Sequence, residues 1–94
     1  MRVHVEFLGV SRLGTGTKEK CFDLQEGASF RELVQLLAGS YPALIGDVIQ
    51  PQLDELQAPN RLLIKGNRFL KQDQMDDKLD DGDRVVLMSL SVGG

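Results

Sequence analysis

The chain has 94 residues, of which 41% are hydrophobic and 27% charged, and its net charge is −3. This length fits one domain with a single core, and no apolar run is long enough to span a membrane. The single cysteine, Cys21, cannot form an intrachain disulfide, and no secretory signal pattern is present, so we expect a cytoplasmic protein.

The N-terminal stretch RVHVEFLGV alternates apolar and polar residues, which predicts a strand with Val3, Val5 and Phe7 on one face. The following SRLGTGT is typical of a Gly-rich turn. EKCFDLQ then predicts a short second strand that completes an N-terminal hairpin.

After the second strand, the spacing of the apolar residues changes to that of a helix. Ser29 stands three residues before Glu32, which is the spacing of a capping box, and apolar residues follow at helical intervals. Gly39 occupies the position of a left-handed C-terminal cap, and Pro42 comes shortly after it. We expect a helix over residues 30–38.

The second half of the chain predicts mainly strands. Residues 41–60 hold a short helical turn or two and no recognisable chemistry. RLLIKGNRFL predicts a strand, a turn at residues 65–68 and a short return strand, and RVVLMSL predicts a last strand at residues 84–90. This order gives an α+β fold of the β-grasp type, with one main helix across one face of a mixed sheet. We expect a single domain over residues 1–90 and a flexible tail over residues 91–94.

Six aspartates gather between Asp73 and Asp83, just before the last strand, and no basic stripe balances them. Such a field repels phosphate backbones, so nucleic acid is not expected as a partner. The run is either a solvated connection with turn-forming aspartates or a docking surface for a basic partner.

The last strand is apolar on both faces. Val85 and Leu87 point one way, and the other face carries Val86, Met88 and Leu90. A sheet covered by one helix leaves its second face to solvent. Either a partner protein covers that second face, or the strand is apolar because it is central.

Autonomous catalysis is not expected, because the chain offers few groups for it. His4 falls on the polar phase of the first strand and is interpreted as a surface residue, and Cys21 as a small hydrophobe. No Cys or His residues have metal-ligand spacing, so no metal site is predicted. The Gly14–Thr15–Gly16 stretch lacks the lysine of a phosphate loop.

The ending SVGG is therefore the most informative part of the sequence. Glycine suits a tail that must pass through a narrow channel, because it has no Cβ and adopts extended conformations freely. We interpret Gly94 as the bearer of an activated terminal carboxyl group and Gly93 as the residue that keeps the tail slim.

The stretch LDDGDRVVLMSLSVGG at residues 79–94, together with the order of strands and helix, resembles the ubiquitin-like sulfur carrier proteins, and most nearly the small subunit of molybdopterin synthase. The resemblance implies that an E1-like adenylating enzyme uses ATP to activate the terminal glycine, which becomes a thiocarboxylate. The tail would then donate sulfur to a pterin precursor in the large subunit of molybdopterin synthase. No bound cofactor is implied.

The same resemblance implies the residues that contact a partner. They would be Phe7 together with the outward side chains of the last strand and tail, Val86, Met88, Leu90 and Val92.

Other functions fit the same sequence. The activated Gly94 could be joined to lysines of other proteins, as in ubiquitin-like modification, or the sulfur could serve thiamine, cysteine or tRNA thiolation. A third class is a β-grasp interaction module in which the two glycines are incidental.

Overall fold

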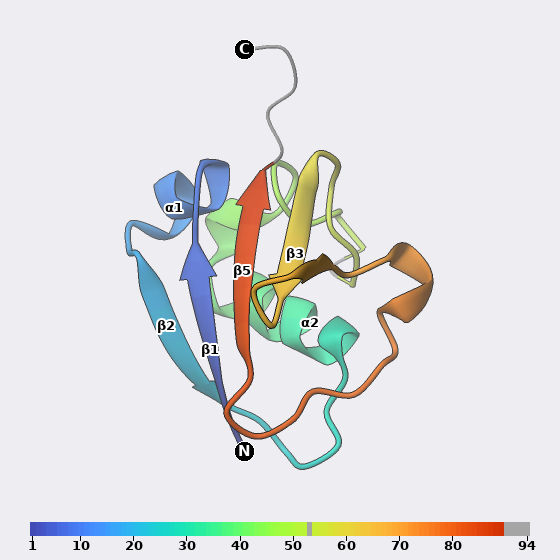
Figure 1. The fold of residues 1–94 in the computed structure, drawn as a ribbon. Coiled ribbons are helices and arrows are strands. Elements are labelled where there is room, and N and C mark those ends of the chain that lie inside the picture. Colours follow the sequence, from blue (N-terminus) through green and yellow to red (C-terminus); the bar gives the residue numbers. More distant parts are fainter. Residues whose placement is uncertain (53, 90–94) are drawn as a thin grey trace.

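The computed structural model describes residues 1–52 and 54–89, so the predicted tail and Leu90 lie outside the described residues. In chain order the elements are β1 (Arg2–Phe7), α1 (Val10–Thr15), β2 (Glu19–Asp23), α2 (Phe30–Ser40), the short 3-10 helix η1 (Pro42–Leu44), β3 (Asn60–Ile64), β4 (Arg68–Phe69), the 3-10 helix η2 (Gln72–Gln74) and β5 (Arg84–Ser89). Figure 1 shows helix α2 behind the sheet, with β1 and β5 side by side at its centre.

The strands form one mixed sheet in the order β2-β1-β5-β3-β4. β1 and β5 run parallel, with Val5 opposite Val85 and Phe7 opposite Leu87. The other neighbouring pairs are antiparallel. A parallel pair needs a long crossover connection, which here is the chain from α1 to the turn before β5. The predicted β-grasp architecture is therefore confirmed.

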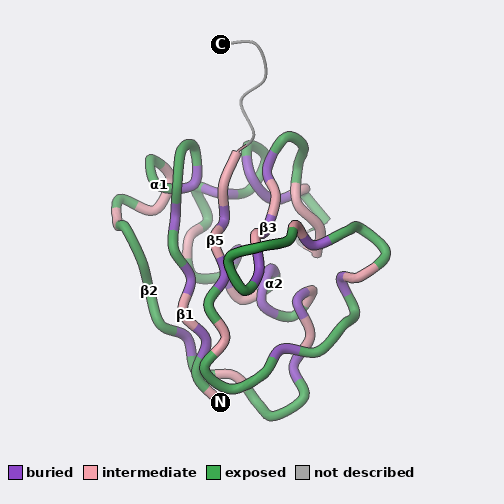
Figure 2. Tube along the Cα trace, in the orientation of Figure 1, coloured by how far each residue is buried: buried purple, intermediate pink, exposed green. Residues whose placement is uncertain are grey.

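Burial alternates along the central strands, as the two-residue period requires (Figure 2). The side chains that face α2 form the core, and most of them are almost inaccessible. Its members are Val3, Val5, Phe7, Phe22, Phe30, Leu33, Val34, Leu37, Ala38, Leu44, Val48, Ile49, Leu62, Ile64, Leu70, Met75, Leu79, Val85 and Leu87.

Helix α2 begins as the sequence predicted. The Ser29 hydroxyl accepts a hydrogen bond from the Glu32 amide at 3.2 Å, which satisfies one of the free amides of the first turn. The predicted cap at Gly39 is wrong, because the helix continues through Gly39 to Ser40. Tyr41 closes it, and its amide donates to the Leu37 carbonyl at 2.8 Å. The end falls there because Pro42 disfavours a helical conformation in the residue before it.

The predicted turn between the first two strands is also wrong, because it contains α1. Gly9 and Gly16 flank this helix, each with φ of 71°, a value that glycine adopts without strain. Ser11 is fully buried, and its hydroxyl donates to the Leu87 carbonyl at 2.7 Å. Contacts with β5 therefore hold a helix that local propensity does not favour.

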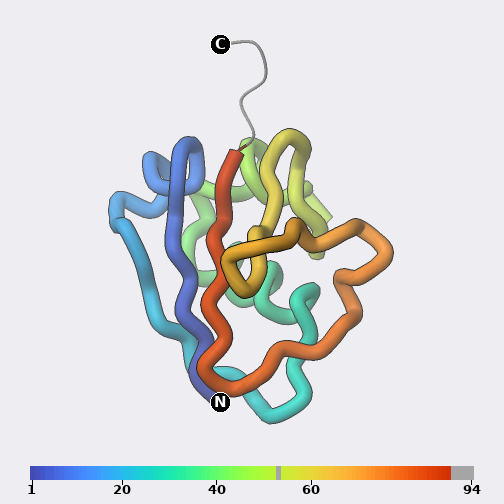
Figure 3. The backbone as a smooth tube through the Cα atoms, in the orientation of Figure 1, coloured from blue at the N-terminus to red at the C-terminus, as the bar shows by residue number. Residues whose placement is uncertain are grey.

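The aspartate run connects β4 to β5 along the lower edge of the sheet (Figure 3). Met75 and Leu79 of this segment are buried. The Asp83 carboxylate accepts from the Asp80 amide at 2.8 Å, and the Asp81 carboxylate accepts from the Arg2 amide at 2.7 Å. The first bond lies within the turn before β5, as the interpretation of turn-forming aspartates predicted, whereas the second ties this turn to the start of β1.

Candidate functional site

The sheet face turned away from α2 carries an apolar cluster at its centre. Val86 and Met88 of β5 are half-buried there, beside Leu63 of β3 and Phe69 of β4. Val86 is opposite Leu63, and Leu63 is opposite Phe69, so the three form a row across the strands. We call these four residues the open-face patch.

Arg61 borders the open-face patch. It pairs with Met88 across β3 and β5, and its guanidinium lies 5.2 Å from the centre of the Phe69 ring. A cation over an aromatic face is attracted by the ring quadrupole, which orders this long side chain along the patch. The surface thus combines an apolar centre with an ordered cation at its edge.

The patch explains the apolar character of both faces of the last strand. Val85 and Leu87 lie in the core, whereas Val86 and Met88 lie on the open face. The predicted contact residues Leu90 and Val92, and Gly93 and Gly94, fall outside the described residues. The described part of β5 ends at Ser89, one residue beyond Met88.

The prediction that Phe7 belongs to the contact face is wrong. Phe7 is fully buried on the helix side of the sheet, opposite Leu87. Its ring meets Tyr41 edge-on, with ring centres 5.6 Å apart and an interplanar angle of 75°. The alternation that puts Val3 and Val5 in the core puts Phe7 there as well.

A second apolar surface lies at the end of the sheet where β5 finishes. Leu8, Val10 and Leu13, from the end of β1 and from α1, are exposed, and Leu13 keeps 86% of its surface accessible. Figure 1 shows α1 at the same end of the molecule as the tip of β5. Sequence reasoning missed this surface because it placed a turn there.

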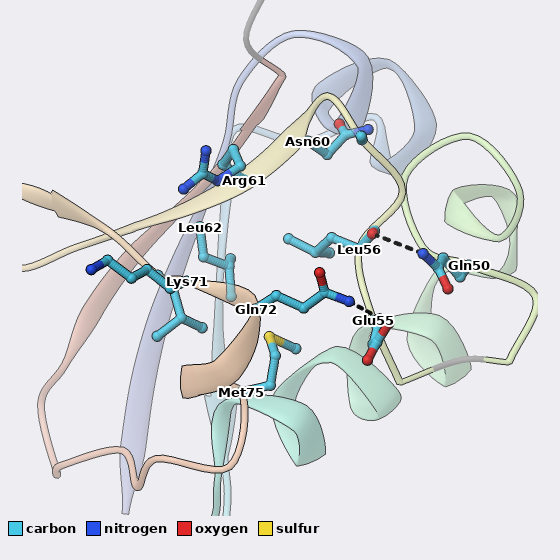
Figure 4. A pocket seen from close by; sticks show the side chains of 11 residues that line it. Gln50, Glu55, Leu56, Asn60, Arg61, Leu62, Lys71, Gln72 and Met75 are labelled. Atoms are coloured by element: carbon cyan, nitrogen blue, oxygen red, sulfur yellow. Dashed lines mark hydrogen bonds between the residues drawn. The ribbon is translucent and has the colours of Figure 1, made fainter.

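A pocket of about 320 Å³ opens between β3, the loop residues Gln50, Glu55, Leu56 and Ala58, and the segment that follows β4 (Figure 4). Leu56, Leu62 and Met75 give it an apolar wall, and the Gln72 side-chain amide donates to the Glu55 carboxylate at 3.3 Å near its edge. No sequence motif indicated this pocket, since its walls come from three separate segments.

Arg31 of α2 links the two loops on this side of the molecule. Its Nε donates to Asp76 at 2.8 Å, and Nη1 lies 3.4 Å from an Asp54 carboxylate oxygen and 3.6 Å from one of Glu55. The hydrogen bond from Arg31 and its positive charge lower the pKa of Asp76, and the same bond raises the pKa of Arg31. This ion-pair cluster fastens the loops to the helix.

The structure brings together two residues that the sequence treated separately. His4 and Cys21 face each other on β1 and β2, with Nδ1 and Sγ 3.0 Å apart. Elsewhere in residues 1–52 and 54–89, no three His, Cys, Asp or Glu side chains are grouped so that they could hold a metal ion.

Comparison with known proteins establishes the fold class. No family model matches the chain, and no curated protein matches it by sequence. Its structure is similar to that of SAMP1 from Haloferax volcanii, with a TM-score of 0.83, 18% identity and full coverage of both chains. The chain is therefore a ubiquitin-like β-grasp domain.

Two further structures have the same fold. A candidate molybdopterin converting factor, subunit 1, from Pyrococcus furiosus matches with a TM-score of 0.73 and 22% identity, covering 96% of this chain and 98% of that one. Urm1 from Trypanosoma brucei matches with a TM-score of 0.75 and 24% identity, covering 99% and 95%. The β-grasp fold that the sequence resemblance implied is therefore shared with these structures. None of the helices in the described part of the chain is long and apolar enough to cross a membrane.

Proposed function

We propose that the chain is a sulfur carrier whose terminal Gly94 carboxyl group is adenylated and converted to a thiocarboxylate, which then donates sulfur in molybdopterin biosynthesis. The observation that carries this proposal is that Val86 and Met88 of the open-face patch lie on β5, the strand that precedes SVGG in the sequence. One strand then contributes both to the docking surface and to the carrier segment.

Chain geometry limits how the carrier segment would work. Gly94 is the fifth residue after Ser89, and five fully extended residues span at most about 18 Å. A partner that holds the open-face patch must therefore place its reactive centre within about that distance of the end of β5. Glycines at the end of such a segment leave room for catalytic groups to approach the carboxyl.

The chemistry itself would belong to partner enzymes. A carboxylate is inert toward sulfur nucleophiles until it is activated, and an acyl adenylate formed from ATP supplies a good leaving group. An E1-like enzyme would carry out this step in the cytoplasm. A large subunit of the molybdopterin synthase type would bring the thiocarboxylate to its acceptor. We assign the open-face patch, with Val86 and Met88 at its centre, to docking, and Leu90 and Val92 to contacts inside the partner.

The decisive experiment is intact mass spectrometry of the protein isolated from its native cell. We expect a species that ends at Gly94 and whose mass has increased by the replacement of one oxygen by sulfur. Deletion of Gly93 and Gly94 should abolish sulfur donation while the urea unfolding midpoint stays unchanged. A matched Ser91→Ala variant should retain donation. Retained cofactor synthesis in the deletion variant would overturn the proposal.

A second candidate function is protein modification through the same Gly94. It is supported by the fold shared with a protein named small archaeal modifier protein 1 from Methanosarcina acetivorans, which matches with a TM-score of 0.79. Modification and sulfur donation share the adenylate and differ in the nucleophile that attacks it. Covalent conjugates to lysines in the native cell would favour modification, whereas a thiocarboxylate without conjugates would favour the carrier. Sulfur donation to thiamine, cysteine or tRNA would be distinguished by the metabolite lost on deletion of the gene.

A further inference from the structure

The His4–Cys21 pair places a thiol and an imidazole nitrogen at hydrogen-bond distance. The two residues are directly opposite in the antiparallel β1–β2 ladder. The His4 amide donates to the Asp83 carbonyl at 2.8 Å, away from β2, so the pair occupies a non-hydrogen-bonded site of that ladder. Side chains approach most closely at such sites, which accounts for the 3.0 Å between Cys21 Sγ and His4 Nδ1.

Packing gives no reason for a thiol at this position. Cys21 is exposed, whereas its neighbour Phe22 points into the core. β2 is an edge strand, so among the described residues no further strand covers that side of the sulfur. Cys21 therefore does not pack in the core as a small hydrophobe would, and a reagent in solution has access to its sulfur.

We propose that Cys21 is a site of reversible S-thiolation by low-molecular-weight disulfides, with His4 as its general base. A thiol is activated in this way when an adjacent imidazole accepts its proton. The proposal concerns the open face near β2 and is independent of the Gly94 carboxyl.

The exchange balances without a further reactant. The Cys21 proton passes from Sγ to Nδ1 of His4, and the resulting thiolate attacks one sulfur of the disulfide. A new S–S bond forms to Cys21 as the original S–S bond breaks. The departing thiolate takes the proton from the imidazolium. The reagent disulfide gains the two electrons that Cys21 loses. Attack by a second thiol on the mixed disulfide reverses the reaction.

The charges around the pair are mixed, so accessibility rather than charge selects the reagent. The neighbouring charged residues on this face are Arg2 and Glu6 of β1, Glu19 and Asp23 of β2, and Arg84 of β5. Arg2 Nε is 3.4 Å from the Asp23 carboxylate, in an exposed ion pair. The predicted reagent class is therefore small disulfides, both neutral and charged.

The test compares thiol reactivity in matched variants. Cys21 is the single cysteine, so the release of chromophore from dithiodipyridine reports this site alone. We expect the folded protein to react faster than His4→Gln by about tenfold or more, since general-base assistance commonly contributes at least that factor. Glu6→Gln lies on the same face of the same strand and should react like the wild type.

Two further measurements complete the test. Glutathione disulfide should give an adduct on the wild type that dithiothreitol removes, seen by intact mass. Wild-type protein unfolded in urea should react more slowly than folded protein, because unfolding separates Cys21 from His4. This comparison does not depend on the folding of the His4→Gln variant. Equal rates in His4→Gln and wild type, or in folded and unfolded protein, would overturn the proposal, as would the absence of an adduct.

Discussion

Gly9 lies directly against Ser89, so that a Cβ placed on Gly9 would stand 2.5 Å from the Ser89 hydroxyl oxygen. This contact joins the start of α1 to the last described residue of β5. The end of the described part of β5 is therefore packed against the segment before α1. Only glycine satisfies both the contact and the φ of 71°.

Gly9→Ala should destabilise the protein more than Gly16→Ala. Gly16 has the same φ, but a Cβ there would meet nothing within 4 Å, so its substitution measures the backbone cost alone, about 1–2 kcal/mol. Gly9→Ala should cost about 1 kcal/mol more, because the Ser89 side chain must leave its rotamer. Urea unfolding measures both, and the excess should vanish in a Ser89→Ala background. An excess that persists there would contradict the contact as its cause.

Ser29→Ala should weaken helix α2 at its first turn. The substitution removes the acceptor of the Glu32 amide and should lower the free energy of unfolding by about 1 kcal/mol. Ser40→Ala is the control, because Ser40 is exposed at the other end of the same helix and should change stability by less than about 0.5 kcal/mol. Equal effects of the two substitutions would show that the cap contributes little.

The sequence predicted the strands and the helix that have a regular spacing of apolar residues. Val3, Val5 and Phe7 alternate with polar residues, and the Ser29–Glu32 spacing marks the start of the main helix, so the sheet and α2 follow from local pattern. The order of these elements then indicated one main helix across one face of a mixed sheet.

What the sequence missed depends on tertiary contacts. α1 contains Gly14, a poor helix former. The helix is held by the hydrogen bond from Ser11 to the Leu87 carbonyl. Gly14 also lets the Leu44 side chain pack closely, because a Cβ on Gly14 would lie only 2.9 Å from it. No local pattern encodes these partners. The His4–Cys21 pair was missed for a related reason. It depends on the register of the first two strands, which is set by the segment containing α1.

Substitutions at two neighbouring residues of β5 should affect different properties, one the stability of the fold and the other the docking of a partner. Leu87 is fully buried, and Leu87→Ala should cost about 2–5 kcal/mol. Met88 is half-buried on the open face, and Met88→Ala should cost no more than about 1 kcal/mol. If the proposed docking is correct, Met88→Ala should still weaken binding to the adenylating enzyme, measured by calorimetry at a temperature where both variants are folded. Glu19→Gln, on the open face of β2, should bind like the wild type. If Met88→Ala binds the adenylating enzyme as tightly as the wild type does, the open-face patch is not part of the interface.

The Arg31–Asp76 ion pair should make stability depend on acid pH. Arg31 lowers the pKa of Asp76 below its ordinary value of 3.8, so the folded state binds this proton less readily than the unfolded state. The stabilising contribution is therefore fully present above the ordinary pKa and is lost as the pH falls through the lowered, folded value. Asp76→Asn should be less stable than the wild type at neutral pH, and the two unfolding curves should converge in strong acid.

The magnitude of that difference should be small and sensitive to salt, because the Asp76 side chain is 80% exposed and solvent screens the pair. Asp73→Asn is the matched control, since Asp73 is exposed on the same segment, and its stability should follow the wild type across the pH range. Urea unfolding at a series of pH values in low and high salt measures both variants. A difference between wild type and Asp76→Asn that stays constant into strong acid would mean that the Asp76 charge, and hence its pairing with Arg31, does not stabilise the fold.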